Sequence, residues 1–228
     1  MPTSSLIELL AAAVLFTGGH FLLSAPHVRA RLVAILGEPK FLAIYSVIML
    51  LTFGWLIVSY LRAPIEPVWT SAPWTHGVAL GLMPFAFILL VGGLRPDNPT
   101  AVASLSARAN RAIPGFFAIT RHPFLWAVTL WSIAHLLANG DRASIVLFGS
   151  QLILALFGTV AIDGKRRRRD PQRWRQLASE TSNLPFAAIV AGRAKLAPRA
   201  LLWPVALGLA LYVLFLAGHH WLFGVSPL

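Results

Sequence analysis

The sequence predicts an all-α, polytopic membrane helix bundle with about six transmembrane helices and short interfacial helices on the cytoplasmic side. Only 12% of its 228 residues are charged, about half the share found in soluble domains, and its mean hydropathy is +0.71. The hydrophobic residues gather into runs that are long enough to cross roughly 30 Å of hydrocarbon. We therefore expect one integral membrane domain over residues 1–228, with its core at 5–193 and a last helix at about 200–223.

Turn signals separate the expected spans, for example Gly37-Glu38-Pro39 and Asn139-Gly140-Asp141. The fourth span is near the lower length limit for a crossing helix, and the fifth is expected to end at Asp163-Gly164. In the third span, Gly77 and Gly81 form a small-residue face that favours close approach of another helix. The six expected spans are about Leu6–Ser24, Phe41–Leu61, Trp74–Leu94, Pro123–Asn139, Ser144–Ile162 and Ala200–Phe223.

The links between spans predict the interfacial helices. Thr100 is placed to cap a short amphipathic helix at Ala101–Arg111. Asp170, followed by a proline at the first helical position, predicts a second interfacial helix at Gln172–Ser179. The apolar stretch Phe186–Val190 is expected to lie on the membrane or dip into it.

The net charge of +11 would indicate nucleic-acid binding on a soluble surface, but its distribution indicates membrane topology instead. The three links expected on one side hold three, four and ten of the 19 Lys and Arg residues, including the run Lys165–Arg169. By the positive-inside rule these links face the cytoplasm, so both termini face the periplasm of a bacterial inner membrane. Membrane lipids are therefore expected partners and nucleic acid is not.

The residues available for chemistry inside the membrane are mainly histidines. No cysteine is present, which excludes disulfides, thiolate catalysis and cysteine-ligated metals. The spans contain almost no carboxylates, so the usual relay of a proton-coupled transporter is missing. His20 and His135 lie inside spans, and His76 and His219 lie near the expected outer edge. Imidazole is a common metal ligand, and two facing rings can hold a haem iron; the alternative is that the rings only brace helices through hydrogen bonds.

His135 shares a helix face with Trp131, Ser132 and Asn139, and this indole wall beside small polar groups would suit a flat cofactor. His135 lies about 18 Å along its helix from the cytoplasmic end, whereas His20 lies only about 6–9 Å from that end. By depth, His122 is therefore the natural neighbour of His20, and His219 or His76 that of His135.

The corner Arg121-His122-Pro123 stands at the expected cytoplasmic boundary, on the same side as Arg108 and the arginine run. Converging Arg and His side chains bind phosphate or carboxylate well, so the corner is a candidate anion or cofactor site. The alternative is that it marks the start of a helix and anchors the topology.

Several motifs, in this order, resemble the NnrU family over nearly the whole chain. They are Gly19-His20-Phe21-Leu22-Leu23-Ser24, Leu36-Gly37-Glu38, Tyr45-Ser46, Thr120-Arg121-His122-Pro123, Trp131-Ser132-Ile133-Ala134-His135-Leu136, Asn139-Gly140-Asp141 and Leu184-Pro185-Phe186. The resemblance implies a multi-pass bacterial membrane protein linked with denitrification and nitric oxide metabolism.

The same pattern is similar to zeta-carotene isomerase, a haem b enzyme that isomerises a carotenoid double bond with ferrous haem. In that likeness His20 and His135 match the proposed axial ligands, His122 matches the motif histidine, and Ser132 stands where the isomerase has an alternative cysteine ligand. The resemblance thus implies haem b between the first and fourth spans, with Arg121, His122 and Arg108 anchoring propionates or orienting the loop. It also implies a hydrophobic polyene as a substrate and a respiratory or denitrification complex as a partner.

A fainter likeness, carried by Arg121-His122-Pro123, runs to isoprenylcysteine carboxyl methyltransferases. It implies an S-adenosylmethionine-dependent membrane enzyme. A third hypothesis is a non-catalytic assembly factor for a respiratory reductase, in which the histidines only brace helices.

Overall fold

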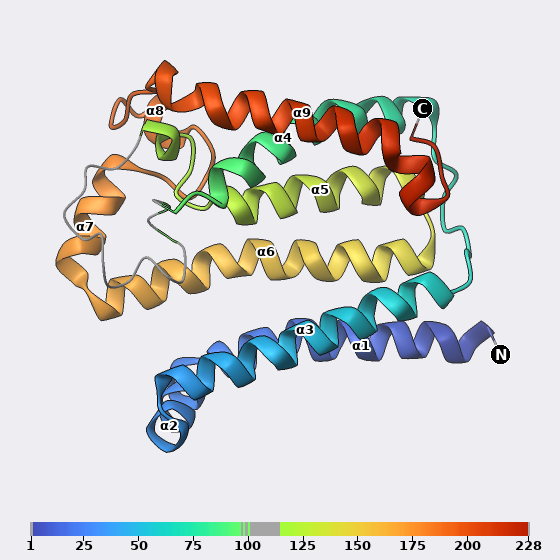
Figure 1. Ribbon diagram of the computed structural model, residues 1–228, viewed down its shortest axis with the longest axis horizontal. Helices are drawn as coiled ribbons and strands as arrows, with labels where there is room; N and C mark the ends of the chain where they lie inside the picture. The colour runs from blue at the N-terminus through green and yellow to red at the C-terminus, as the bar shows by residue number, and fades with distance from the viewer. Residues whose placement is uncertain (1, 97, 99, 101–114, 228) are drawn as a thin grey trace. The chain divides into compact units, whose positions relative to one another are not determined.

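Helices form the framework of this computed structural model, in which residues 2–96, 98, 100 and 115–227 are described (Figure 1). The all-α prediction is confirmed: within those residues the only β-type pairing is an isolated bridge between Pro67 and Asp141. The elements in chain order are α1 (Pro2–Ser24), α2 (Pro26–Leu36), α3 (Glu38–Arg62), α4 (Pro73–Gly93), the 3-10 helix η2 (Gly115–Ala118), α5 (Pro123–Asn139), α6 (Arg142–Arg169), α7 (Pro171–Glu180), α8 (Ala187–Val190) and α9 (Pro198–Phe223).

The expected membrane spans are present. Five helices, α1, α3, α4, α6 and α9, are long and apolar enough to cross a membrane, and α5 is a shorter apolar helix. Between 11% and 28% of the most apolar window of each long helix is buried within the protein, so the remaining aliphatic surface faces outward, as it does in a bundle surrounded by lipid. The chain is therefore a multi-pass membrane protein.

The end of α6 differs from the prediction. The sequence predicts an end at Asp163-Gly164, but α6 continues through the arginine run to Arg169. Lysine and arginine are good helix formers, and cations in the last turn stabilise the negative end of the helix macrodipole. These effects outweigh the cost of Gly164, which is about 1 kcal/mol in a helix interior.

The link between the first two spans is helical, which the sequence analysis did not predict. Pro26 is the first residue of α2, a position where proline's missing N–H is harmless. Gly37, with φ of 77°, ends α2 by donating its N–H to the carbonyl of Val33 at 2.8 Å.

The helix predicted at Gln172–Ser179 is present as α7, and its position at the membrane interface remains a prediction. The Asp170 carboxylate accepts a hydrogen bond from the backbone N–H of Arg173 at 3.0 Å, which is the expected N-terminal cap. At the other end of α7, the Arg193 guanidinium donates to the carbonyl of Ala178 at 2.7 Å. The predicted apolar stretch Phe186–Val190 contains the single-turn helix α8. The helix predicted at Ala101–Arg111 lies outside the described residues, as does Arg108.

The described contacts divide the chain into two compact units, one of which comprises Met1–Ala72 and His135–Leu154. In this unit α1 and α3 lie side by side (Figure 1). The packing is close at Gly19, where an added Cβ would lie 3.3 Å from Cε of Met49. Near the other end of α1 the Trp55 indole N–H donates to the Glu8 carboxylate at 3.0 Å, so this intramembrane acid has a partner.

The turn between α5 and α6 belongs to the same unit and depends on a glycine. Gly140 has φ of 71°, and its carbonyl accepts from the backbone N–H groups of Val68 and Trp69 at 2.8 and 3.1 Å. An added Cβ would lie 2.5 Å from the carbonyl oxygen of Trp69. Both the backbone conformation and the close approach therefore require glycine.

The other unit comprises Pro73–Ala134 and Ala155–Leu228, in which α4 and α9 lie side by side (Figure 1). Their backbones meet at Gly208, where an added Cβ would lie 2.7 Å from Cα of Ile88. Gly77 and Gly81, which were predicted to permit such an approach, have no described atom within 4 Å of an added Cβ. That prediction was therefore wrong, because spacing identifies a possible contact face but not whether another helix packs there.

We expect Gly208→Ala to lower the free energy of unfolding by about 1–3 kcal/mol, because the added methyl group overpacks a backbone contact. Thermal or denaturant unfolding in mild detergent measures this. Gly218→Ala in the same helix is the matched control, since its added Cβ meets only Leu222 at 3.7 Å. Equal stability of the two variants would contradict the close α4–α9 contact.

Candidate functional site

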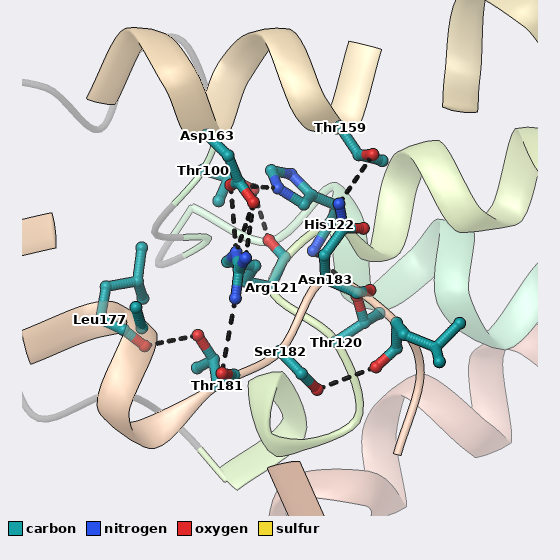
Figure 2. A network of polar contacts seen from close by, with 12 residues as sticks. Thr100, Thr120, Arg121, His122, Thr159, Asp163, Leu177, Thr181, Ser182 and Asn183 are labelled. Atoms are coloured by element: carbon teal, nitrogen blue, oxygen red, sulfur yellow. Dashed lines mark hydrogen bonds and ion pairs between the residues drawn. The ribbon is translucent and has the colours of Figure 1, made fainter. Parts of the chain in front are cut away.

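The described polar side chains converge most densely at the corner that precedes α5 (Figure 2). Arg121 and His122 stand between η2 and α5, where Pro123 starts the helix and occupies the position that proline favours. α6 brings Asp163 to this corner, 41 residues further along the chain than His122. The residue that marked the expected end of this helix thus supplies the carboxylate of the site.

Asp163 accepts hydrogen bonds from both side chains of the corner. Arg121 Nε lies 3.0 Å from each carboxylate oxygen of Asp163, and its Nη2 also donates to the second oxygen. His122 Nε2 lies 2.7 Å from the first oxygen. The Arg121 guanidinium also stacks over the Trp174 ring at 4.9 Å. With only 14% of the Asp163 side chain exposed, this many donors are needed to compensate for the lost hydration.

The backbone of the corner is held from two further segments. Arg121 donates its backbone N–H to the Ser182 carbonyl at 2.9 Å, and its own carbonyl accepts from the Thr100 hydroxyl at 2.6 Å. The Thr120 hydroxyl donates to the Asn183 carbonyl at 2.6 Å. Four stretches of chain that are distant in sequence therefore meet at three consecutive residues.

Asn183 extends this network toward α5 and α6. Its side-chain amide donates to the Thr159 hydroxyl on α6 at 2.9 Å, and its backbone carbonyl accepts from the Trp126 indole N–H at 2.8 Å. The segment that follows α7 is therefore fixed against two membrane helices by polar contacts.

His122 is a neutral imidazole with one nitrogen engaged. Burial lowers the pKa of His122 from its ordinary value, and this effect exceeds the opposing influence of the Asp163 carboxylate. Since Nε2 faces the carboxylate, the proton of the neutral ring resides there and is donated to Asp163. Nδ1 is buried and has no hydrogen-bond partner among the described residues.

This arrangement alters the interpretation of the corner. Arg121 and His122 were predicted to bind a phosphate, a carboxylate or haem propionates, but the Asp163 carboxylate occupies that position. From the sequence, Asp163 was expected only to mark the end of a helix and was not paired with the corner. The available signal was its charge: a carboxylate in an otherwise acid-free span requires a cationic partner.

His20, on α1, has an oriented ring. Its Nδ1 lies 3.2 Å from the Phe16 carbonyl one turn earlier, a distance at which Nδ1–H donates. The ring meets Phe16 and Tyr45 edge-on, with centroids 4.7 and 5.8 Å away. Nε2 makes no hydrogen bond within the part of the chain that the structure describes, and an imidazole held in this way through one nitrogen is suited to binding a metal through the other.

His135, on α5, has a different aromatic neighbourhood. Its ring stacks on Phe148 of α6 with centroids 4.7 Å apart and an interplanar angle of 26°. Phe148 in turn meets Tyr60 of α3 edge-on at 6.0 Å. One turn before His135, Trp131 is half-buried and Ser132 is fully buried, with no described hydrogen-bond partner for the Ser132 hydroxyl.

The ring contacts of His20 and His135 reach α3 at different levels. Tyr45 and Tyr60, the residues of α3 in these two neighbourhoods, are separated by about 22 Å along the helix at 1.5 Å per residue. Two nitrogens bound to one metal lie about 4 Å apart, twice a bond of about 2 Å. These contacts give no support for one iron bound by both rings, and the pairing of His20 with His135 remains a prediction. The alternative pairings with His122, His76 and His219 also remain predictions.

Comparisons with known proteins identify relatives of the chain. A family model described as NnrU protein matches residues 8–227. A curated protein, 15-cis-zeta-carotene isomerase, chloroplastic, from Zea mays, is 34% identical over 82 residues. The match covers 36% of this chain and only 22% of the maize protein, so the chain spans about a fifth of that relative. No solved structure matches the chain significantly.

We expect Asp163→Asn to lower the free energy of unfolding by about 3 kcal/mol or more, because it leaves Arg121 buried without a counter-charge. Unfolding in mild detergent tests this. The control is Glu66→Gln, which removes an exposed ion pair with Arg142 and should cost less than about 1 kcal/mol. A loss for Asp163→Asn no larger than the control's would show that the cluster does not hold the fold.

Acid is expected to destabilise the protein through His122. The unfolded chain binds a proton at this residue below about pH 6.5, whereas the folded protein resists it because burial lowers the pKa of His122. Stability contributed by the neutral ring is therefore present above pH 6.5 and is lost as the pH falls toward the lowered pKa. His122→Gln should flatten this slope in unfolding measured from neutral to mildly acidic pH. Identical slopes in the two proteins would contradict the assignment.

Proposed function

Given that the chain belongs to the NnrU protein family, we propose that it is a haem b-dependent enzyme that isomerises a double bond of a polyene lipid within the membrane. The observation that carries the proposal is the oriented ring of His20, which lies in a candidate membrane-spanning helix. The maize relative, whose name states that it isomerises 15-cis-zeta-carotene, supports the class of reaction. Because its match is short, the substrate and cofactor are part of the proposal.

His20 is the residue that we propose as the haem ligand. The Phe16 carbonyl fixes the ring by accepting from Nδ1, which directs the Nε2 lone pair away from its own helix. Phe16 and Tyr45 meet the ring edge-on and limit its rotation. When bound, haem supplies a redox-active iron that can interact with the electrons of a carbon–carbon double bond.

An apolar groove in the same unit suits a polyene chain. It lies between α1 and α6 and has a volume of about 320 Å³, which is within the usual size range of small-molecule sites. Its lining is aliphatic except for one arginine at the edge: Leu6, Ile7, Leu10, Ile145, Val146 and Arg142. A hydrophobic, uncharged substrate would leave no polar group without a partner in such a groove.

The reaction that we propose changes only geometry. A cis double bond becomes trans by rotation, so no atom is gained or lost and no net electron is consumed. The protein must therefore bind the apolar chain and exclude water, and its carboxylates and arginines are not required for chemistry. This agrees with the engagement of Arg121 and His122 by Asp163.

The other hypotheses receive less support. A methyltransferase would need the donors of Arg121 and His122 for its cofactor, but these donate to Asp163. The predicted role in nitric oxide or denitrification metabolism, the predicted respiratory or denitrification complex, the bacterial inner membrane and the periplasmic termini all remain predictions.

Purified in mild detergent from cells supplied with haem, the protein should show a haem absorption band and a reduced-minus-oxidised difference spectrum. His20→Ala should abolish or strongly reduce haem content, because it removes the oriented nitrogen. The exposed His220 offers a matched control, and His220→Ala should retain full haem content. In cells that accumulate the cis polyene, His20→Ala should also lose isomerisation, measured by chromatography of the cis and trans products.

His135→Ala separates two forms of the proposal. If His20 is the sole protein ligand, this variant keeps its haem and its spectrum. If both rings bind the iron, the spectrum changes from that of two imidazole ligands to that of one. A wild-type protein that stays colourless with haem supplied would exclude haem dependence in either form.

A further inference from the structure

The segment between α7 and α9 exposes large apolar side chains. Leu184, Phe186 and Val190 are 62%, 49% and 86% exposed. They lie within seven residues on the chain, in α8 and the turn before it, and we call the segment Leu184–Val190 the α8 patch. Single exposed apolar residues are ordinary, but three within one short segment point to an interaction surface.

The backbone at the centre of the α8 patch is in an unfavourable conformation. Phe186 has φ of 65° and is the only described residue other than glycine with positive φ, a conformation that bulky residues rarely adopt. Its N–H donates to the Ile119 carbonyl at 2.7 Å, and its carbonyl accepts from Val190 at 2.9 Å. These contacts fix the backbone at Phe186. A strained residue that is held by its surroundings is a recognised sign of a functional site.

The chain around the α8 patch is strongly basic. Residues 165–199 contain ten Lys and Arg against two Asp and Glu, a net charge of +8 out of the chain's +11. Several of these side chains are exposed, and they lie on the end of α6, on α7 and on the segment before α9: Arg167, Arg168, Arg169, Arg175, Arg193, Lys195 and Arg199. Such a combination of basic and apolar side chains complements an anionic lipid surface.

We propose that the α8 patch is an interfacial anchor that inserts Phe186 and its apolar neighbours among the headgroups of anionic phospholipids. The basic side chains at the end of α6, on α7 and before α9 contact the phosphates, and the strained backbone of Phe186 keeps the ring pointing outward. The position suits this role, because the segment joins α6 and α9, two helices that are able to cross the membrane. The proposal is independent of haem and of the isomerase reaction.

The absence of cysteine permits a clean test. In Val190→Cys, a nitroxide label reports whether the α8 patch contacts lipid or water, through its accessibility to oxygen and to a water-soluble nickel chelate. In nanodiscs containing phosphatidylglycerol, we expect the label to become more accessible to oxygen and less to nickel than in phosphatidylcholine alone. The control is Gln172→Cys on the exposed start of α7, whose label should stay accessible to nickel in both lipids.

Two further variants identify the cause. Replacing Arg167, Arg168 and Arg169 by glutamine should remove the response of the label to phosphatidylglycerol. High salt should do the same in the labelled Val190→Cys protein that keeps these arginines.

Phe186→Gly should raise the thermal midpoint of unfolding, because glycine adopts positive φ without strain. In this variant the label at position 190 should also withdraw from lipid. A label that remains in water in both lipids, or one that responds equally to both, would overturn the proposal. A lower thermal midpoint for Phe186→Gly would assign the ring to packing and also overturn it.

Discussion

The corner between η2 and α5 depends on the compensation of one buried carboxylate. Removing Asp163 from water is unfavourable unless charged donors surround it, and Arg121 and His122 provide four hydrogen bonds to it. Because those donors stand on consecutive residues, the backbone between η2 and α5 has little freedom. The same residues then fix the segment after α7 through Ser182 and Asn183. A single electrostatic requirement therefore determines how several distant stretches of chain meet.

Composition and periodicity were sufficient to predict the fold class, because each span in lipid must be apolar and long enough to cross roughly 30 Å of hydrocarbon. The bounds of α5, Pro123–Asn139, agree with the prediction because a proline and an Asn-Gly turn mark its ends. The partnership of Asp163 with His122 could not be predicted, since it joins residues 41 positions apart and depends on how α6 packs against the corner. Close helix contact was expected at Gly77 but occurs at Gly208, because sequence spacing does not specify which face meets a neighbour.

The surroundings of the histidines, and not their residue type alone, distinguish the candidate metal ligands from one another. His20, His122 and His135 were all candidate ligands from sequence, yet their surroundings differ. His122 donates to a carboxylate inside a polar cluster, and His135 stacks on a phenylalanine. His20 has one nitrogen directed to its own helix and lies inside a candidate membrane-spanning helix, which is why the proposal rests on it. The residue proposed for chemistry therefore lies in a different part of the chain from the hydrogen-bond network around Asp163.

The length of α5 determines which bilayer thickness this helix matches. Its 17 residues rise about 25 Å, several ångströms less than the hydrocarbon thickness of a typical bilayer. The charged cluster stands directly at the start of this helix, so α5 cannot be lengthened at that end without moving Arg121 and Asp163 into hydrocarbon. Where α5 meets lipid, thinning of the bilayer is one way to match its length, at a modest energy for each ångström. Hydrophobic mismatch of this kind would favour residence of the protein in thinner membranes.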